Sequence, residues 1–253
     1  MSIDWNVTPA AIWRQFKGNL RAVREIDPVR FDELLNVDRQ KAALQRNTER
    51  FLAGKPANNT LLWGSRGTGK SSLIKAMLNE YFPQGLRVIE VDKDDLIYLP
   101  EIVDEVRDLP QRFIIFCDDL SFEAGEKTYK VLKSVLEGSI ELPPKNVLIY
   151  ATSNRRHLMP EYMSENLETK LVNNEIHQGD SVEEKVSLSD RFGLWLSFYP
   201  FNQDSYLDII DHYFHAYTGD REALHRLAIQ FATSRGGRSG RVAFQFYKQH
   251  SEN

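Results

Sequence analysis

One eight-residue motif constrains the fold of this chain more than any other feature of the sequence. Residues 64–71 read Gly-Ser-Arg-Gly-Thr-Gly-Lys-Ser, the pattern G-x-x-x-x-G-K-S of a phosphate-binding loop. An apolar run, Thr60–Trp63, leads into the motif, and a helical pattern, Ser72–Leu78, leads out of it. Strand, loop and helix in this order are the setting that the motif needs, and they argue against a plain glycine-rich turn. The sequence therefore predicts that the chain binds a nucleoside triphosphate.

Each part of the motif has an expected chemical role. Glycines let the backbone curl so that successive N–H groups converge on phosphate oxygens, and the N-terminus of the following helix adds partial positive charge. We expect Lys70 to reach the outer phosphates and the Ser71 hydroxyl to bind Mg²⁺. The expected nucleotide-binding residues are the loop and its neighbour, Gly64, Ser65, Arg66, Gly67, Thr68, Gly69, Lys70, Ser71 and Ser72.

The composition is that of an ordinary globular protein. Of the 253 residues, 42% are hydrophobic and 27% are charged, which suits one large domain with a small companion. The net charge of −4 gives no global electrostatic reason to expect nucleic-acid binding, although it allows local basic patches. The single cysteine, Cys117, excludes an internal disulfide and a cysteine-cluster metal site, and we expect it to be buried and unreactive.

The sequence contains no signal for a membrane or for export. No apolar stretch approaches the roughly 18 residues of a membrane span. The first residues, Met1–Trp5, lack the basic start and apolar core of a secretion signal. We therefore expect a cytoplasmic protein without a membrane partner.

Short apolar runs alternate with helical patterns from residue 60 onward, which is typical of parallel strands joined by crossover helices. The runs are Thr60–Trp63, Leu86–Val91, Arg112–Cys117, Asn146–Ala151 and Leu194–Phe198. Five such strands around a phosphate loop predict an α/β fold, a three-layer P-loop NTPase sandwich with a five-stranded, mainly parallel sheet. After Pro200 only helical patterns occur, over about 203–217, 221–233 and 239–250, with Asn202 as the cap of the first. They predict a small all-helical lid domain.

The predicted organisation has three parts: an N-terminal helical extension over residues 1–33, an α/β nucleotide-binding domain over 34–200 and the helical lid over 201–253. Within the second part, a helix is expected over about 38–53. The polar stretch 158–181 predicts an exposed loop with one short helix.

The N-terminal extension is expected to contain one amphipathic helix. Thr8-Pro9 resembles a helix start, with the threonine as N-cap and the proline at the first helical position. Behind it, Ile12, Phe16 and Leu20 recur every four residues. The pattern predicts a helix over 9–25 that either docks on the core or meets a partner.

Polar side chains follow two predicted strands behind the loop. Asp118 and Asp119 end the apolar run that begins at Phe113. In phosphate-loop enzymes an acid at such a strand end holds Mg²⁺ through its water shell, the role expected for Asp118. Asp119 stands where many ATPases carry a glutamate that activates the attacking water, and because it is shorter it would act through an extra water or hydrolyse slowly. Asn154, at the next strand tip, is expected between the terminal phosphate and that water, with an Asx turn as the alternative.

Several arginines are candidates for contact with the nucleotide. Arg191, in Ser-Asp-Arg-Phe-Gly, would reach a neighbouring subunit's nucleotide as an arginine finger, and a surface pair with Asp190 is the alternative. At the start of the last helix, Arg241 is the first candidate for an arginine that moves over the bound triphosphate, and Arg238 is the second. The alternative is that these residues only form the start of a helix. The basic cluster of Arg155, Arg156 and His157 suits either a surface that faces a subunit or solvent, or a direct functional contact.

These pieces, in this order, resemble the AAA+ ATPase superfamily from about residue 34 to the C-terminus. The resemblance identifies Gly64–Ser71 with Walker A, Asp118-Asp119 with Walker B, Asn154 with sensor 1, Arg191 with the arginine finger and Arg241 with sensor 2. More narrowly, four strings are similar to a bacterial stand-alone AAA+ family of unknown function, namely Asn58–Gly64, Phe116–Phe122, Tyr150–Leu158 and Ser187–Gly193.

The resemblance implies a set of cofactors, partners and further site residues. It implies ATP and Mg²⁺ as cofactors, exchange of ATP and ADP, and hydrolysis between the subunits of a ring-shaped homo-oligomer. It also implies that Leu35 and Val37 line the adenine pocket. The sequence departs from the superfamily at Asp119, where glutamate is usual.

Two functions stay open at this point. In the first, an ATP-hydrolysing ring remodels or loads an unknown protein or nucleic-acid client. In the second, which Asp119 favours, the chain is a slow-hydrolysing, ATP-gated binding module that resembles helicase loaders and initiators. A small-molecule kinase would leave Asn154 and the helical domain without a role, and no Asn-Lys-x-Asp string supports a GTPase. Tyr98 is the candidate aromatic of a client-threading pore, and packing against a helix is its alternative.

Overall fold

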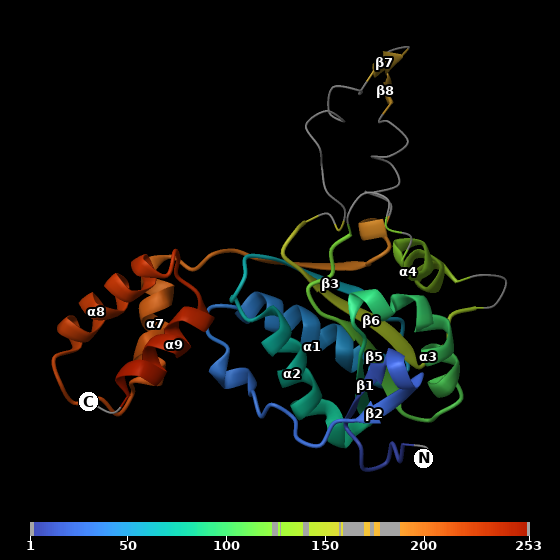
Figure 1. Ribbon diagram of the computed structural model, residues 1–253, viewed down its shortest axis with the longest axis horizontal. Coiled ribbons are helices and arrows are strands. Elements are labelled where there is room, and N and C mark those ends of the chain that lie inside the picture. Colours follow the sequence, from blue (N-terminus) through green and yellow to red (C-terminus); the bar gives the residue numbers. More distant parts are fainter. Residues whose placement is uncertain are drawn as a thin grey trace.

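A seven-stranded sheet forms the centre of the molecule in the computed structural model (Figure 1). The structure describes residues 3–122, 126, 128–138, 142–156, 158, 170–172, 175–177 and 188–251. The strands of the sheet, in spatial order, are β2 (Asn19–Ala22), β1 (Ala10–Arg14), β4 (Leu86–Glu90), β5 (Arg112–Cys117), β6 (Val147–Ser153), β3 (Thr60–Gly64) and β9 (Leu194–Phe198). All neighbours pair in parallel except β1 and β2. The five predicted strands are confirmed, but the prediction of five strands in all is wrong, because β1 and β2 extend the sheet.

The predicted helix over residues 9–25 is wrong. The segment instead forms β1, a 3₁₀ turn at Gln15–Lys17 and β2. Alternate residues of the two strands, among them Trp13 and Leu20, pack into the core, while Phe16 lies at the exposed turn. Pairing with β4 covers a sheet edge that would otherwise leave backbone N–H and C=O groups unpaired, and this gain overrides the four-residue spacing.

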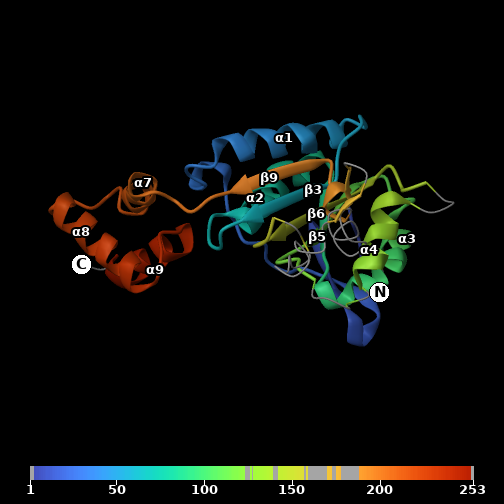
Figure 2. The same ribbon diagram turned by 90° about the horizontal axis from the view of Figure 1, so that it is seen from above.

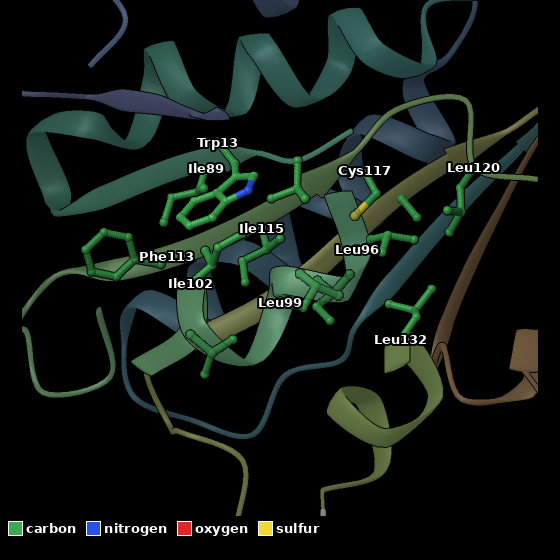
Figure 3. Packing of buried hydrophobic residues seen from close by; sticks show 14 of the residues in the cluster. Trp13, Ile89, Leu96, Leu99, Ile102, Phe113, Ile115, Cys117, Leu120 and Leu132 are labelled. Carbon is green, nitrogen blue, oxygen red and sulfur yellow. The ribbon is translucent and has the colours of Figure 1, made fainter. Parts of the chain in front are cut away.

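Helices cover both faces of the sheet and make the predicted three layers. On one face lie α1 (Asp38–Leu52) and α2 (Lys70–Tyr81), and on the other lie α3 (Leu99–Val106) and α4 (Thr128–Glu137) (Figure 2). Successive residues of β5 enter opposite cores: Ile114 and Phe116 pack with α1 and α2, and Ile115 and Cys117 pack with α3 and α4. This follows from the two-residue period of a strand. Fully buried aliphatic and aromatic side chains fill both cores. Figure 3 shows those of the core on the side of α3 and α4.

Short elements complete this part of the chain. The 3₁₀ helices are η2 (Phe31–Glu33), η3 (Phe82–Gln84) and η4 (Lys93–Tyr98). Tyr98, the candidate pore aromatic, packs against the core, with its ring 5.5 Å from that of Trp13 on β1. The predicted loop 158–181 lies largely outside the described residues. The part of this segment that the structure describes contains two antiparallel strands, β7 (Lys170–Val172) and β8 (Glu175–His177).

Three helices follow the sheet in the described part of the C-terminal region and pack around a core of their own. They are α7 (Gln203–Tyr213), α8 (Arg221–Ser234) and α9 (Gly240–His250). Tyr206, Ile210 and Phe246 are among their fully buried residues. Each helix begins at a side-chain cap, and the expected cap Asn202 accepts a hydrogen bond from the Ser205 N–H at 2.8 Å. No helix among the described residues is long and apolar enough to span a membrane.

Candidate nucleotide-binding site

A cleft of about 860 Å³ lies where the phosphate loop, the segment that follows β2, and the C-terminal helices α7 and α9 meet. Both groups of elements contribute side chains to its wall. The lining includes Arg66, Gly67, Thr68, Gly69, Lys70, Ser71, Ser72, Asp118, Asp119, Thr152, Asn154, Gly240 and Arg241. The structure therefore brings most of the sequence-predicted site residues together in one place. Two of the predicted loop residues do not line the cleft, namely Gly64, the last residue of β3, and Ser65, which follows it.

The phosphate loop is held in shape by two close backbone approaches. At Gly64 (φ 127°) a Cβ would overlap the Phe198 carbonyl oxygen of β9, which accepts a hydrogen bond from the Ser65 N–H at 2.9 Å. At Gly67 (φ 72°) a Cβ would lie 2.8 Å from Ser239 Oγ, at the start of α9. The first contact anchors the loop to the sheet, and the second joins the loop to the helical part of the chain.

Lys70, the first residue of α2, is folded back over the loop. Its Nζ donates hydrogen bonds to the carbonyl oxygens of Gly64 and Ser65, both at 2.8 Å, and to Asn154 Oδ1 at 3.3 Å. Burial lowers the pKa of the ammonium group, while the nearby carboxylates of Asp118 and Asp119 act in the opposite direction. A buried cation of this kind favours an anionic partner in the cleft.

Ser71 and Asp118 form a pair of oxygen donors at the bottom of the site. Ser71 Oγ donates to Asp118 Oδ1 at 2.7 Å, and the Thr152 hydroxyl donates to the same carboxylate oxygen. Hydroxyl and carboxylate oxygens are the donors that Mg²⁺ prefers, so this pair fits the ion. The described residues contain no group of three or more His, Cys, Asp or Glu that could hold a metal without further ligands. A magnesium ion here would complete its shell with phosphate oxygens and water.

Asp119 has an unusual backbone conformation and a defined set of partners. Its φ of 50° lies in the left-handed region, and its N–H donates to Thr152 Oγ1 at 2.9 Å and to Asp118 Oδ1 at 3.1 Å. The Asn154 side-chain amide donates a hydrogen bond to Asp119 Oδ1. Asn154 thus contacts both Lys70 and Asp119, which places these three side chains around one point of the cleft. Thr152, which orients both acids, was missed, although it lies two residues before Asn154 on the same strand.

The neighbouring cysteine takes no part in this arrangement. Cys117 is fully buried, and burial raises the pKa of its thiol to about 12. The thiol is therefore protonated near neutral pH and shielded from reagents, as expected from the sequence.

The C-terminal helices supply one of the two candidate arginines. Arg241 lines the cleft from the first turn of α9, and its Cβ would lie 3.2 Å from a Cβ on Gly67. Arg238 is not among the lining residues. Of the two, the structure places Arg241 against the phosphate loop.

Arg191 lies away from the cleft of its own chain. Its guanidinium forms an ion pair with Glu137 at the end of α4. The alternative, a surface pair with Asp190, is thus not the ion pair that the structure shows. In the basic cluster 155–157, the Arg156 guanidinium lies 5.7 Å from the centre of the Trp63 ring, and His157 lies outside the described residues.

Apolar side chains form the other end of the cleft. Leu35 and Val37, the predicted adenine-pocket residues, both line it, and Val37 is buried. Ile209 and Tyr213 of α7 and Phe244 of α9 also line the cleft and were not predicted from the sequence. The helical periodicity of these residues indicated only an apolar face and not what that face would meet.

The segment after β2 was also missed as part of the site. Asp27, Pro28 and Val29 line the cleft beside α2. Lys75 Nζ lies 3.0 Å from Asp27 Oδ2, and the Asn79 amide donates to the carbonyl oxygens of Asp27 and Val29 at 2.8 and 2.9 Å. These contacts tie the N-terminal segment to the helix that begins at the phosphate loop.

Comparison with known proteins agrees with this fold. Residues 6–253 match the family described as "Protein of unknown function (DUF815)". Over 69 residues the chain is 36% identical to the replication factor C large subunit of Staphylothermus marinus, a match that covers 27% of this chain and 16% of that protein.

Two solved structures share this fold with TM-scores above 0.5. The Aeropyrum pernix Orc1 protein in complex with DNA has a TM-score of 0.58 at 18% identity, covering 83% of this chain and 58% of that one. A DNA replication initiation factor has a TM-score of 0.54 at 18% identity, covering 90% of this chain and 65% of that one. The chain thus spans less than two thirds of the length of both, and the likeness is one of fold.

The fold, the phosphate loop and the family match lead to one assignment. The chain is a member of the AAA+ ATPase superfamily and belongs to the DUF815 family of proteins of unknown function.

Proposed function

We propose that the cleft binds ATP with Mg²⁺ and that the chain hydrolyses ATP, as a cytoplasmic homo-oligomer, to remodel or load a macromolecular client. The observation that carries this proposal is the hydrogen-bonded series Lys70–Asn154–Asp119 beside the phosphate loop. It brings a cation, a neutral amide and a carboxylate to the place where the outer phosphate of a loop-bound nucleotide would lie.

Binding follows from the charge and shape of the cleft. The N–H groups of the loop and the N-terminus of α2 attract phosphate oxygens, and the buried Lys70 gains an anionic partner when a phosphate enters. Leu35, Val37 and Tyr213 offer an apolar surface of the kind that accepts a purine base. Ser71 Oγ and Asp118 would hold the magnesium ion, which when bound neutralises charge that develops on the phosphate oxygens.

Hydrolysis needs a group that orients the attacking water. We assign this role to Asp119, whose position is fixed by the hydrogen bond from Asn154 and by its own N–H bond to Thr152. Arg241, on α9, is assigned to contact the triphosphate when the helical part of the chain, which we propose to act as a lid, closes over it. Arg191 is assigned to a neighbouring subunit's nucleotide, because within its own chain it pairs with Glu137 outside the cleft.

The client is proposed only as a class. Two of the similar proteins are named as a replication factor and a DNA replication initiation factor, and the Orc1 protein was solved in complex with DNA. These names favour a nucleic acid or a protein that works on one as the client.

Phosphate release at several protein concentrations tests the enzymatic part of the proposal. The specific activity should rise with protein concentration, and Arg191→Ala should abolish turnover while ATP affinity, measured by calorimetry, stays unchanged. Lys70→Ala should abolish binding. Turnover that depends on neither protein concentration nor Arg191 would refute hydrolysis between subunits.

A second function is favoured by one observation, the short side chain of Asp119 in the place of the usual glutamate. In this alternative, ATP sets the affinity for a partner and slow hydrolysis only resets the molecule. Client affinity measured with ATP, with ADP and without nucleotide decides between the two functions. Equal affinity in all three states would remove this alternative.

A further inference from the structure

The tip of the β1–β2 hairpin carries the most exposed large hydrophobic side chain among the described residues. Phe16 is 101% exposed and lies in the 3₁₀ turn between the two strands. Gly18, with φ 55°, follows it in the left-handed region and turns the chain into β2. A phenylalanine ring that is fully exposed to water is not used in the core, and its apolar surface is free to gain the free energy of burial when a ligand covers it.

The same hairpin has a one-sided charge. Residues 14–24 contain four cations and no acid, in a chain whose net charge is −4. Arg14, Lys17, Arg21 and Arg24 are all exposed, and none forms an ion pair with any described residue. Burial and the nearby Asp92 and Asp94 raise the pKa of Asp95, and Arg14 partly opposes this shift, so Arg14 is the hairpin cation that lies near acids. The hairpin is therefore a local basic patch on an acidic molecule.

Strand register shows which side the patch occupies. Trp13 pairs with Leu20, and both pack into the core, so this face of the hairpin is used for folding. Residues on the opposite face are the pairs Arg14 with Asn19 and Ile12 with Arg21. Arg14 and Arg21 therefore share one face, about 7 Å apart along the strands for two steps of roughly 3.4 Å each.

The hairpin lies at the edge of the sheet opposite β9, with β2 as the outermost strand. Figure 2 shows it in blue, extending from the sheet away from the C-terminal helices. No other element among the described residues pairs with the outer side of β2. The patch is thus open to a large ligand.

We propose that this hairpin binds single-stranded nucleic acid, with Phe16 stacking on a base and Arg14, Lys17 and Arg21 contacting the flanking phosphates. An unstacked base offers a flat π-face that a fully exposed aromatic ring can cover, and its backbone offers one negative charge per nucleotide. An acidic protein segment would satisfy the arginines but would give the exposed ring no comparable partner. The combination of ring and cations on one turn therefore favours a single strand.

A short covalent path links the hairpin to the nucleotide cleft. Five residues after β2 ends at Ala22, Asp27 lines the cleft and pairs with Lys75 of α2. Binding at the hairpin and binding in the cleft therefore act on one segment. This inference deepens the proposed function and rests on it in one respect, since it takes the ligand of the hairpin to be the client of the ATP-driven molecule.

Fluorescence anisotropy of the full chain with a labelled oligothymidylate tests the proposal. The probe should have about 20 nucleotides, more than the roughly 4–16 that one such binding face covers. Phe16→Leu, which keeps an apolar side chain without a π-face, should weaken binding about tenfold, and Phe16→Trp should preserve it. Replacing Arg14, Lys17 and Arg21 by Gln should lower the slope of log affinity against log salt by about 2, at roughly 0.7 for each lost phosphate contact.

A charge-matched control separates the hairpin from net charge. Arg46, Lys55 and Lys145 are exposed and lie outside the hairpin and the cleft, and their replacement by Gln should leave the slope unchanged. Equal binding by the parent and Phe16→Leu would overturn the proposal. Tighter binding of a duplex of the same length, or of a polyglutamate peptide, would also overturn it. If no probe bound at all, the proposal would fail as well, and the cations would serve only to protect the sheet edge from pairing with other chains.

Two further measurements keep this proposal distinct from the ATPase. Oligothymidylate binding should persist in Lys70→Ala without nucleotide, and Phe16→Leu should retain basal ATP turnover. If the parent binds the oligonucleotide but no ATP, only the proposed function fails. If it hydrolyses ATP but binds no oligonucleotide, only the inference fails.

Discussion

Asp119 combines a left-handed backbone with a side chain in the candidate catalytic position. Its N–H is bonded to Thr152, and its carboxylate is bonded to Asn154. Asparagine tolerates the left-handed region, so Asp119→Asn should fold normally and still bind ATP. It cannot accept a proton from water, so we expect turnover to fall at least about a hundredfold. Phosphate release measures turnover, and nucleotide retention after gel filtration should rise.

The comparison for this variant is Asp118→Asn, which should weaken the dependence of ATP binding on Mg²⁺, since Asp118 is the proposed ligand beside Ser71. If Asp119→Asn turned over ATP at the parent's rate, Asp119 would not be the group that orients the water.

Gly67 is the residue at which the loop touches the start of α9. Gly67→Ala should strain the backbone, by about 1–2 kcal/mol for a left-handed residue, and should also press on Ser239 Oγ at 2.8 Å. Because the second effect pushes α9 and Arg241 away from the loop, we expect ATP affinity to fall about tenfold. Isothermal calorimetry measures it.

A matched control exists at Gly236, with φ 80° and no heavy atom within 4 Å of an added Cβ. Gly236→Ala should lose a similar amount of stability but keep its ATP affinity. Equal affinities of the two variants would show that the contact with Ser239 does not serve the nucleotide.

Site residues that belong to a recognisable motif or follow one of the predicted strands could be assigned to the cleft from the sequence. Site residues from other segments could not. Asp118, Asp119 and Asn154 follow strands whose carboxyl ends meet at one edge of a parallel sheet, so their meeting with Lys70 was foreseeable. Asp27 and Tyr213 reach the same cleft from segments with no motif. Their positions depend on tertiary packing, which no local pattern encodes.

At the scale of elements, the β1–β2 hairpin shows how a helical pattern can mislead. Ile12, Phe16 and Leu20 have helical spacing, yet Phe16 is fully exposed and the buried residue between them is Trp13. The sequence did contain a strand pattern, since Ala11 and Trp13 lie two residues apart and Gly18 separates them from Leu20. This pattern covers too few residues to outweigh the four-residue spacing in a prediction. By contrast, the C-terminal helices were predictable because capping residues such as Asn202 mark their starts locally.

Trp13 anchors this hairpin to the sheet and gives a stability prediction. It is 5% exposed, and its Nε1 finds no hydrogen-bond partner among the described residues. Trp13→Ala should lower the free energy of unfolding by about 3–5 kcal/mol through the cavity that it leaves. Trp13→Phe keeps a ring and removes the unpaired N–H, so its loss should be smaller, roughly 1 kcal/mol. Denaturant unfolding followed by far-UV circular dichroism measures both.

If Trp13→Phe were as damaging as Trp13→Ala, the indole N–H would have to be bonded in solution. A loss below about 1 kcal/mol for Trp13→Ala would mean that the hairpin is not docked on the core.

On the scale of the whole molecule, the chain consists of two bodies, the sheet with its covering helices and the C-terminal helices, which meet at the nucleotide cleft. The sheet and its helices bury two clusters, and α7, α8 and α9 bury a third around Tyr206 and Phe246. Contact between the bodies includes the Gly67–Ser239 approach and the hydrogen bonds of the Asn36 amide to the Ser205 carbonyl and to Asp208, at 3.1 and 3.4 Å. Since the polar contacts between these two parts are few among the described residues, the helical part should unfold by itself when the cleft is empty.

Nucleotide should therefore change the unfolding of the whole chain as well as its midpoint. A ligand held by both Lys70 and Arg241 binds the joined bodies more tightly than it binds either body alone, so it couples their unfolding. At a concentration one hundred times its Kd, it stabilises the folded state by about 2.7 kcal/mol. For a chain of this size, that corresponds to a midpoint shift of roughly 5–10 °C. Scanning calorimetry should show two transitions without nucleotide and one with Mg²⁺ and ATP. Chelating the magnesium should reduce the midpoint shift, since Ser71 and Asp118 then lose the ion through which they act. Lys70→Ala should abolish the shift, because the buried ammonium is the cation that faces the outer phosphates. An undiminished shift in Lys70→Ala would place the nucleotide outside the phosphate loop.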